Sequence, residues 1–286
     1  MLRSLTCVLL CALPAVANAQ SGVRILPPEP AFNALYDARS LAMGGTFGAQ
    51  GLTNDALMGN PAAMGGIPAY RVGLKGSWDP NLKDGYAGVS LVDSQAGAVM
   101  AGFSYHFASA GRGDDRRDAH IATAGTAFLL ADWLIAGFSS HYIGMNGARK
   151  ANALTGDGGV LLRFGRLLNL GVSAHNVIPI RNPDFPFYWM ASMGLQFEVF
   201  NLAVDARMQP EREGSPYSLN SGLEISALRW LPIRGGYGYD FALREHTWSA
   251  GLGFSWGSGS LDFGYMRSIG GREKQQLAAS LNIVLF

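Results

Sequence analysis

Hydrophobic and polar residues alternate in segments of about ten residues from Pro68 to the end of the chain. In the segment 98–107, the odd-numbered positions from Val99 to Phe107 are apolar, and the even-numbered positions include Ser104 and His106. A β-strand that crosses a membrane has this pattern, because one face meets lipid and the other meets a lumen. The alternation therefore predicts membrane-spanning strands after Pro68.

This segmentation predicts a transmembrane antiparallel β-barrel of about 14 strands, and thus an all-β fold. The strands are expected near 70–78, 85–93, 98–107, 119–130, 132–143, 157–164, 167–176, 189–198, 201–209, 219–226, 233–240, 246–256, 259–267 and 276–286. Short links alternate with long connections, which are expected near 79–84, 108–118, 144–156, 177–187, 210–216, 241–245 and 268–275. Outer-membrane barrels have short periplasmic turns and longer external loops, so both termini are predicted on the periplasmic side.

A soluble β-sandwich would have the same alternation, but its outer faces should be polar. In this chain the apolar face carries Trp, Phe, Tyr and Leu in strand after strand, without a second apolar sheet to cover them. Hydrophobic residues make up 48% of the chain and charged residues 15%, with 38 glycines, which is a low charge content for a soluble domain. Pattern and composition together favour the barrel.

Residues 1–19 have the features of a cleaved secretory signal, with a basic residue at Arg3, an apolar core and small residues at 17–19. Cys7 and Cys11 lie within this signal, so no disulfide is expected in the mature chain. The loss of Arg3 balances the 22 Lys and Arg residues against the 21 Asp and Glu residues. A neutral chain argues against a nucleic-acid partner, which would require a basic face.

The glycine-rich segment 39–66 does not share the alternation of the strands. Asn60 before Pro61 is typical of a helix start, and the following glycines would end that helix within two turns. Thr53 is a candidate start for a second short helix. A barrel of this width is too wide to be filled by wall side chains alone. We therefore predict that this segment forms a plug in the lumen.

Several positions of the plug carry a family resemblance, namely Arg39, Met43, Gly44, Gly45, Asn54, Asp55, Ala56, Asn60, Pro61 and Ala62. They resemble the N-terminal segment of the long-chain fatty-acid transporter (FadL-like) superfamily, including its PorV-like branch from type IX secretion. The resemblance implies a fourteen-strand outer-membrane barrel. The chain then divides into a signal peptide at 1–19, a periplasmic N-terminus and lumen plug at 20–67, and an outer-membrane barrel at 68–286.

Charged and polar residues on the predicted inner wall form the second group of candidate site residues. They are Arg71, Lys75, His106, His175, Glu198, Asp205, Arg207, Glu224, Arg234 and Asp240, with Gln196 and Asp262 on the same faces. Both signs of charge occur, so a field that selects ions of one sign is not expected. These residues either pair with one another and with the plug or contact a ligand directly.

One predicted external loop, 177–187, is apolar and contains three prolines. Its candidate contact residues are Ile178, Pro179, Ile180, Phe185 and Phe187. Exposed apolar surface of this kind can mark a ligand entrance or a protein contact. Packing of the loop onto the barrel rim is the alternative.

The sequence gives no indication of an enzyme. The five histidines lie on separate predicted strands, without the spacing of a metal site or of a hydrolase, and no glycine-rich phosphate loop is present. Ser139, Ser140 and His141 are adjacent, but neighbouring residues of a strand point to opposite faces. We therefore expect no catalytic residues, no metal and no cofactor.

Two functions follow from the resemblance. The first is passive passage of hydrophobic small molecules across the outer membrane. The second is a PorV-like scaffold that docks components of a secretion, surface-attachment or motility machinery, which the short loops would suit. A plain diffusion porin is disfavoured because a plug would block it. The expected partners are outer-membrane lipid, the assembly machinery that recognises barrels with an aromatic C-terminus such as Phe286, and a hydrophobic ligand or an envelope protein.

Overall fold

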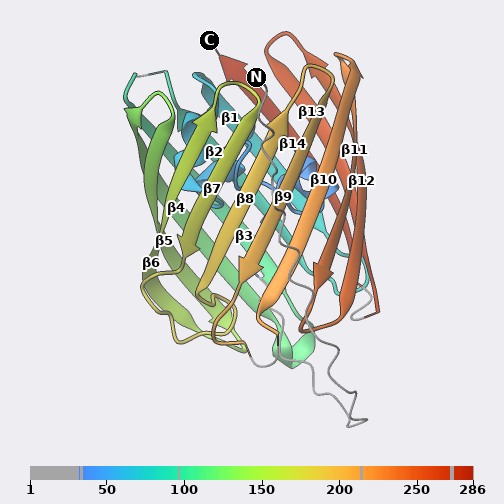
Figure 1. The fold of residues 1–286 in the computed structure, drawn as a ribbon. Helices are drawn as coiled ribbons and strands as arrows, with labels where there is room; N and C mark the ends of the chain where they lie inside the picture. Colours follow the sequence, from blue (N-terminus) through green and yellow to red (C-terminus); the bar gives the residue numbers. More distant parts are fainter. Residues whose placement is uncertain (1–31, 33–34, 96, 213–214, 271–273, 286) are drawn as a thin grey trace, which may run out of the picture.

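Fourteen antiparallel strands close into one barrel, in which β1 pairs with both β2 and β14 (Figure 1). The computed structural model describes residues 32, 35–95, 97–212, 215–270 and 274–285. The predicted signal peptide, with Arg3, Cys7 and Cys11, and the C-terminal Phe286 lie outside the described residues. The predicted fold class is confirmed.

The strands follow one another around the barrel in chain order. Their bounds are β1 Tyr70–Trp78, β2 Gly85–Asp93, β3 Val99–Ala110, β4 Arg117–Ala131, β5 Leu134–Gly147, β6 Ala151–Phe164, β7 Leu168–His175, β8 Tyr188–Gln196, β9 Phe200–Met208, β10 Tyr217–Leu228, β11 Leu231–Asp240, β12 Glu245–Trp256, β13 Gly259–Ile269 and β14 Gln275–Leu285. No helix in the described part of the chain is long and apolar enough to cross a membrane.

The two faces of the wall differ in chemistry, as the alternation predicts. Phe103 on β3 is 50% exposed, whereas its neighbour Ser104 is 1% exposed. Large apolar side chains, including Trp78, Trp189 and Trp248, likewise lie exposed on the outer face. The inner face carries polar and charged side chains that are buried in the lumen. An apolar exterior of this kind suits contact with lipid acyl chains.

Short and long connections lie at opposite ends of the barrel, and the long ones are at the lower end in Figure 1. One predicted connection is wrong: 144–156 is not a long loop. β5 continues to Gly147 and β6 begins at Ala151, so that only 148–150 connect them. The strands extend this far because β4 pairs with β5 up to Arg117 opposite Gly147, where a positive φ of 107° turns the chain.

The described part of the plug, from Leu35 onward, has three short helices inside the barrel. They are α1 (Ala38–Ala42), η1 (Asn54–Leu57) and η2 (Pro61–Gly66). The backbone N–H of Ser40 donates to Asp37 Oδ1 over 2.7 Å at the start of α1, and the Ala62 N–H donates to Asn60 Oδ1 over 3.1 Å at the start of η2. Both side chains thus satisfy N–H groups that a helix start leaves unpaired. The helix starts at Thr53 and Asn60 were predicted, and α1 was not.

Glycines of the wall face the plug at one level of the barrel and form what we call the glycine belt. Its members are Gly102, Gly125, Gly137, Gly159, Gly171, Gly194, Gly222, Gly236, Gly251 and Gly264, one from each of β3–β8 and β10–β13. A Cβ atom added at Gly236 would lie 2.1 Å from the backbone N of Gly44, and one at Gly137 would lie 2.5 Å from the backbone N of Ala62. The plug backbone therefore packs directly against the wall backbone.

A charge on the outer face tests whether this face meets the bilayer core. We expect Phe103→Arg to lower the free energy of unfolding by about 2–4 kcal/mol, because Phe103 lies midway along β3, where lipid excludes water. Leu130→Arg, next to the short connection after β4, should cost about 0–1 kcal/mol. Urea unfolding of both variants in lipid vesicles measures the difference. Equal costs at the two positions would contradict a membrane-spanning wall.

Candidate functional site: the plugged lumen and its outer pocket

An ionic cluster fastens α1 of the plug to the wall. Arg39 on α1 binds both carboxylate oxygens of Glu224 on β10, with Nε to Oε2 at 2.9 Å and Nη2 to Oε1 at 3.1 Å. Arg234 on β11 reaches the same Oε2 over 2.6 Å and joins Asp262 on β13 over 2.7 Å. These four charged side chains are at most 8% exposed. Charged hydrogen bonds between desolvated partners of this kind are strong.

A second cluster binds the plug to β1. Lys75 donates to Asp55 Oδ1 over 2.7 Å and to the backbone carbonyl of Leu35 over 2.5 Å. Arg71 donates to the carbonyl oxygens of Gly51 and Met64 over 2.8 and 2.9 Å. Lys75 thus balances the charge of Asp55, and Arg71 satisfies backbone carbonyl groups of the plug. These contacts explain why both cationic side chains are buried.

The third cluster lies on β9. Asp205 accepts the backbone N–H groups of Phe47 and Gly48 over 2.9 and 3.2 Å. Arg207 donates to the hydroxyl of Tyr36 over 2.7 Å and lies over the rings of Tyr36, Phe47 and Tyr188 at 5.3–5.6 Å. Gln196 on β8 also contacts the plug, because its Nε2 donates to the Gln50 carbonyl over 3.3 Å. Eight predicted wall residues therefore contact the plug directly or through Glu224: Arg71, Lys75, Gln196, Asp205, Arg207, Glu224, Arg234 and Asp262.

Two predicted wall residues lie elsewhere. Glu198 is in the turn between β8 and β9, outside the lumen, with a side chain that is 88% exposed and 3.9 Å from Arg229. The prediction was wrong because β8 ends at Gln196, after which the Phe197 N–H donates to the Phe200 carbonyl and closes the turn. Asp240 ends β11 at the long-connection end, where it pairs with Arg212 over 2.7 Å.

The predicted plug residues follow the course of the chain through the lumen and contact the wall at several strands. After Met43, Gly44 and Gly45 take positive φ angles of 73° and 79° and reverse the chain after α1. Further along, Asn54 donates to Ser90 Oγ over 3.1 Å, and Asn60 Nδ2 donates to the Val160 carbonyl over 3.1 Å. Pro61 and Ala62 pack on Gly137, near the short-connection end of β5. The plug thus contacts the wall on many strands.

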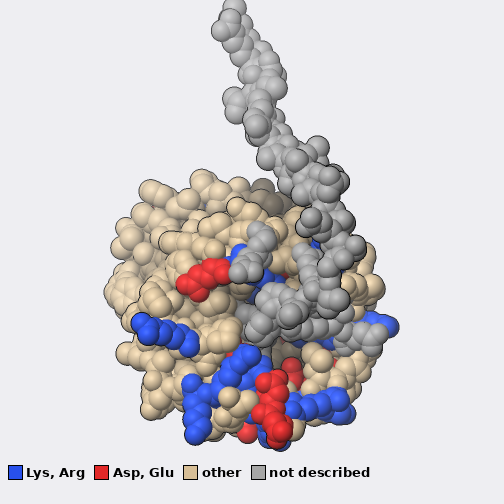
Figure 2. Space-filling model, turned by 90° about the horizontal axis from the view of Figure 1, so that it is seen from below, with Lys and Arg blue, Asp and Glu red and all other residues tan. Residues whose placement is uncertain are grey.

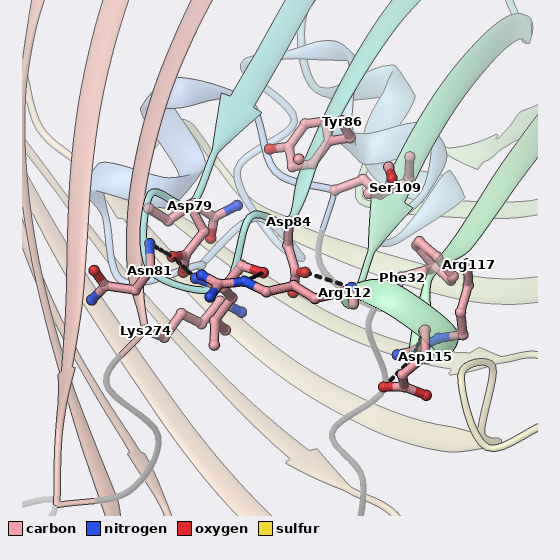
Figure 3. A pocket seen from close by; sticks show the side chains of 16 residues that line it. Phe32, Asp79, Asn81, Asp84, Tyr86, Ser109, Arg112, Asp115, Arg117 and Lys274 are labelled. Carbon is pink, nitrogen blue, oxygen red and sulfur yellow. Dashed lines mark hydrogen bonds and ion pairs between the residues drawn. The ribbon is translucent and has the colours of Figure 1, made fainter. Parts of the chain in front are cut away.

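An outer pocket of about 420 Å³ opens at the long-connection end of the lumen (Figure 3). Its floor is apolar or aromatic and consists of Phe32, Leu35, Tyr86 and Ala108. Its rim carries both signs of charge, from Asp79, Asp84, Arg112, Asp115, Arg117 and Lys274. Figure 2 shows charged side chains of both signs gathered around this end of the barrel. An apolar floor beneath a polar rim is the arrangement of many small-molecule sites.

Hydrogen bonds between loops shape the rim of the outer pocket. Asp84 accepts the backbone N–H of Gly111 over 2.8 Å, and Arg112 donates to the Leu82 carbonyl over 3.3 Å. Partial burial raises the pKa of the Asp84 carboxyl above its ordinary value, while the Gly111 hydrogen bond acts in the opposite direction. These bonds join the loop after β1 to the loop after β3.

The predicted contact loop lies partly inside the barrel mouth. Phe185 is buried and stacks on Phe32 with ring centroids 5.7 Å apart, and Ile180 packs beside them. Asp184 fixes this loop through Arg117 at 3.1 Å and Arg149 at 3.2 Å. Of the other candidate contact residues, Ile178 and Pro179 are exposed, whereas Phe187 is half-buried against the edge of Trp189. Asp184 and Phe185 of this loop are thus buried in the barrel mouth, whereas Ile178, Pro179, Arg181 and Pro183 are exposed.

Three histidines face the lumen, and two of them meet in a cluster that the sequence analysis did not predict. His141 Nε2 and His175 Nδ1 each lie 2.9 Å from Asp157 Oδ2. The cluster continues on both sides: the Thr123 hydroxyl lies 2.8 Å from His141 Nδ1, and the Ser173 hydroxyl lies 2.8 Å from His175 Nε2.

His106, the third of these histidines, is fully buried on β3. Among the described residues, no hydrogen-bond partner lies within reach of either of its ring nitrogens. No group of three or more His, Cys, Asp or Glu residues in the described chain is arranged to hold a metal ion.

One signal for the cluster is present in the sequence, because Ser139 with His141 and Ser173 with His175 share the spacing Ser-x-His. Residues two apart on a strand point to the same face, so each serine lies beside its histidine, at 3.3 and 2.8 Å. The order Ser173, His175, Asp157 is that of a hydrolase triad, but Ser173 is 2% exposed. A nucleophile needs access to its substrate, so this arrangement is a hydrogen-bond network and not evidence of catalysis.

Solved structures of membrane transporters share this fold. The toluene transporter TbuX of Ralstonia pickettii aligns with a TM-score of 0.68 and 14% identity, over 88% of this chain and 98% of that chain. The toluene transporter TodX of Pseudomonas putida aligns with a TM-score of 0.65 and 15% identity, over 91% and 98%. A FadL homologue of Pseudomonas aeruginosa aligns with a TM-score of 0.59 and 12% identity, over 87% and 97%.

No family model and no curated protein matches the chain. Because the structural matches are only 12–15% identical to this chain, the likeness shows a shared fold and no more. The predicted fourteen-strand barrel with an internal plug is therefore confirmed as an architecture, which this chain shares with two toluene transporters and a FadL homologue.

Proposed function

We propose that this protein is an outer-membrane barrel through which small hydrophobic molecules pass without an energy source. The outer pocket carries the proposal, because it places an apolar floor at the long-connection end of a lumen that the plug otherwise fills. The shared fold with two toluene transporters supports the same assignment. An open aqueous pore is disfavoured, since plug residues such as Leu41, Leu57 and Met64 are fully buried.

The size of the outer pocket favours a compact ligand. Its volume of about 420 Å³ is near the lower end of the range of small-molecule sites, which is about 300–1,000 Å³. A single ring fits such a space more readily than an extended acyl chain. The bound molecule would leave when the plug around Asn60 and Pro61 shifts, or sideways through the wall into the membrane.

Location and orientation belong to this proposal as well. The barrel would lie in outer-membrane lipid, inserted by the assembly machinery, with the short-connection end toward the periplasm. Leu285 near the C-terminus lies at that end, where its carbonyl accepts from Gln95 over 2.9 Å. Phe32, in contrast, lies at the long-connection end against Phe185. Residues 1–31 lie outside the described chain, so the predicted periplasmic N-terminus, like the signal peptide at 1–19, stays a prediction.

A scaffold that docks envelope proteins is the second candidate. The short connections favour it, in particular 148–150 between β5 and β6, because they leave little chain for capturing a ligand above the barrel. Pull-down from membranes would recover a defined envelope partner if the scaffold role holds. We place passage first because a docking role does not require an apolar pocket inside the mouth.

Filling the outer pocket tests passage directly. Ala108 is buried on its floor, so Ala108→Trp should bring the uptake of labelled toluene into outer-membrane vesicles close to that of vesicles without the protein. The matched control is Phe107→Trp, which adds the same side chain on the lipid-facing side of β3 and should leave uptake unchanged. If the wild-type barrel does not raise toluene uptake above empty vesicles, the proposed function is wrong.

A further inference from the structure

Behind the outer pocket lies a second, inner cavity of about 40 Å³. Phe32 lines both spaces and is therefore the partition between them. The apolar side of the inner cavity is formed by Phe32, Met58, Ile121, Ile143 and Phe185. Its other side is polar and consists of His141, Asp157, His175, Asn176 and Tyr188. A ligand that moves inward from the outer pocket would meet this polar side after displacing Phe32.

The inner cavity is large enough for a polar group but not for a ring. A water molecule needs about 10–15 Å³ of such space, whereas a dry cavity that binds benzene measures about 150 Å³. The Phe32 ring itself occupies the adjoining ring-sized space, stacked on Phe185 at 5.7 Å with an angle of 22° between the planes. If Phe32 moves away, an aromatic ring can take its place and extend one substituent into the inner cavity.

The hydrogen bonds of the polar side decide which substituent fits. His141 Nε2 and His175 Nδ1 each lie 2.9 Å from Asp157 Oδ2, and the remaining ring nitrogens lie 2.8 Å from the hydroxyls of Thr123 and Ser173. Asp157 Oδ1 accepts the backbone N–H of Asn176 over 2.9 Å. A carboxylate offers about four acceptor positions, so Asp157 can accept from one more donor.

We propose that the inner cavity binds the hydroxyl group of a small aromatic ligand, with Asp157 as acceptor and the ring in the place of Phe32. The proposal rests on the function proposed above and narrows the ligand from hydrocarbons in general to phenols. A carboxylate as the inner group has no proton to donate to the Asp157 carboxylate. A plain hydrocarbon ring gains only the apolar contacts of this site.

The test compares ligands that differ in one group, using the purified full-length barrel in detergent. Equilibrium binding of p-cresol should be about tenfold tighter than that of toluene, since a hydrogen bond to a charged acceptor is worth this factor or more. The carboxylate 4-methylbenzoate should bind more weakly than toluene. Equal affinities for p-cresol and toluene overturn the inference. If the barrel binds toluene but shows no preference for p-cresol, the proposed passage of hydrocarbons still stands.

Two variants separate the acceptor from the ring site. Asp157→Asn removes the charge but keeps the shape, and it should abolish most of the preference for p-cresol. Asp240→Asn, in the Arg212 ion pair at the end of β11, is the matched control and should keep that preference. Phe32→Ala should tighten the binding of both ligands, because the ring site is then empty. An unchanged toluene affinity in Phe32→Ala would overturn the ring site, whatever the behaviour of Asp157→Asn.

Discussion

Replacement of Glu224 by alanine is expected to release the plug and to open the barrel to ions. The wild-type carboxylate compensates both Arg39 and Arg234 within the lumen. Its loss leaves two buried guanidinium groups beside each other, of which Arg234 keeps the ion pair with Asp262 and Arg39 has lost its ion-pair partner. Removal of one partner from a buried ion pair typically costs about 3–5 kcal/mol. Urea unfolding measures this cost, and conductance across a planar bilayer reports an opened lumen.

The matched control for this prediction is Glu198→Ala. Glu198 is also a glutamate beside an arginine, Arg229, but both side chains of this pair are solvent-exposed, and their charged atoms are 3.9 Å apart. Exposed pairs of this kind contribute about 0–1 kcal/mol, so this variant should unfold like the wild type and stay closed to ions. A Glu224→Ala barrel with wild-type stability and no added conductance would show that the ion pairs of Glu224 with Arg39 and Arg234 do not hold the plug.

A single methyl group in the glycine belt should have the second large effect. In Gly236→Ala the new Cβ would lie 2.1 Å from the backbone N of Gly44 and 2.4 Å from the backbone carbonyl carbon of Met43. No side-chain rotation relieves a clash with backbone, so either the plug or the wall must shift. Overpacking of this kind costs about 1–3 kcal/mol. We expect a lower unfolding free energy and intermittent conductance as the displaced plug moves.

Gly235 provides the control within the same strand. It faces the opposite side of β11, and a Cβ there would have its nearest neighbour at 3.9 Å, the carbonyl oxygen of Ser249. Gly235→Ala makes the same chemical change and should therefore alter neither stability nor conductance by a comparable amount. If the two alanine variants behave alike, the close backbone contact of Met43 and Gly44 with β11 does not exist in solution.

Much of the barrel could be predicted from the sequence because every wall strand lies between an apolar exterior and a packed lumen. Each strand therefore alternates apolar and polar residues. This alternation repeats every two residues, so the faces of β3 or β12 follow from the chain itself. The extension of β5 to Gly147 and β6 from Ala151 was missed, since small and polar residues there blur the alternation. Pairing with neighbouring strands, which the sequence does not display, extends both strands.

The helices of the plug also differ in whether a local sequence signal or contact with the wall determines them. Asn60 before Pro61 is a local signal, and the structure has the expected cap there. The helix α1 has a cap at Asp37 but only five residues, too few to show a helical period. It is held by contacts with the wall, such as Ala42 against Gly251, and these depend on the closed barrel.

The candidate site was predictable where charge lies on an inward position of a strand. Lys75 and Asp205 are examples, and their partners in the plug became visible only in the structure. The Ser-x-His spacing places each serine beside its histidine, but the meeting of His141 and His175 at Asp157 depends on the register of three strands and could not be found from spacing. Glu198 shows the reverse error, since its parity is that of the inner face but it lies beyond the last paired residue.

The glycine belt has a consequence for how the plug can move. Side chains at an interface can change rotamer one at a time, so a contact made by side chains can loosen in small steps. A wall position without a side chain has no rotamers, and the backbone of the plug touches it on strand after strand. Partial displacement would then break many contacts at once without forming others. We therefore expect the plug to occupy two discrete states, seated and unseated, with few intermediates between them.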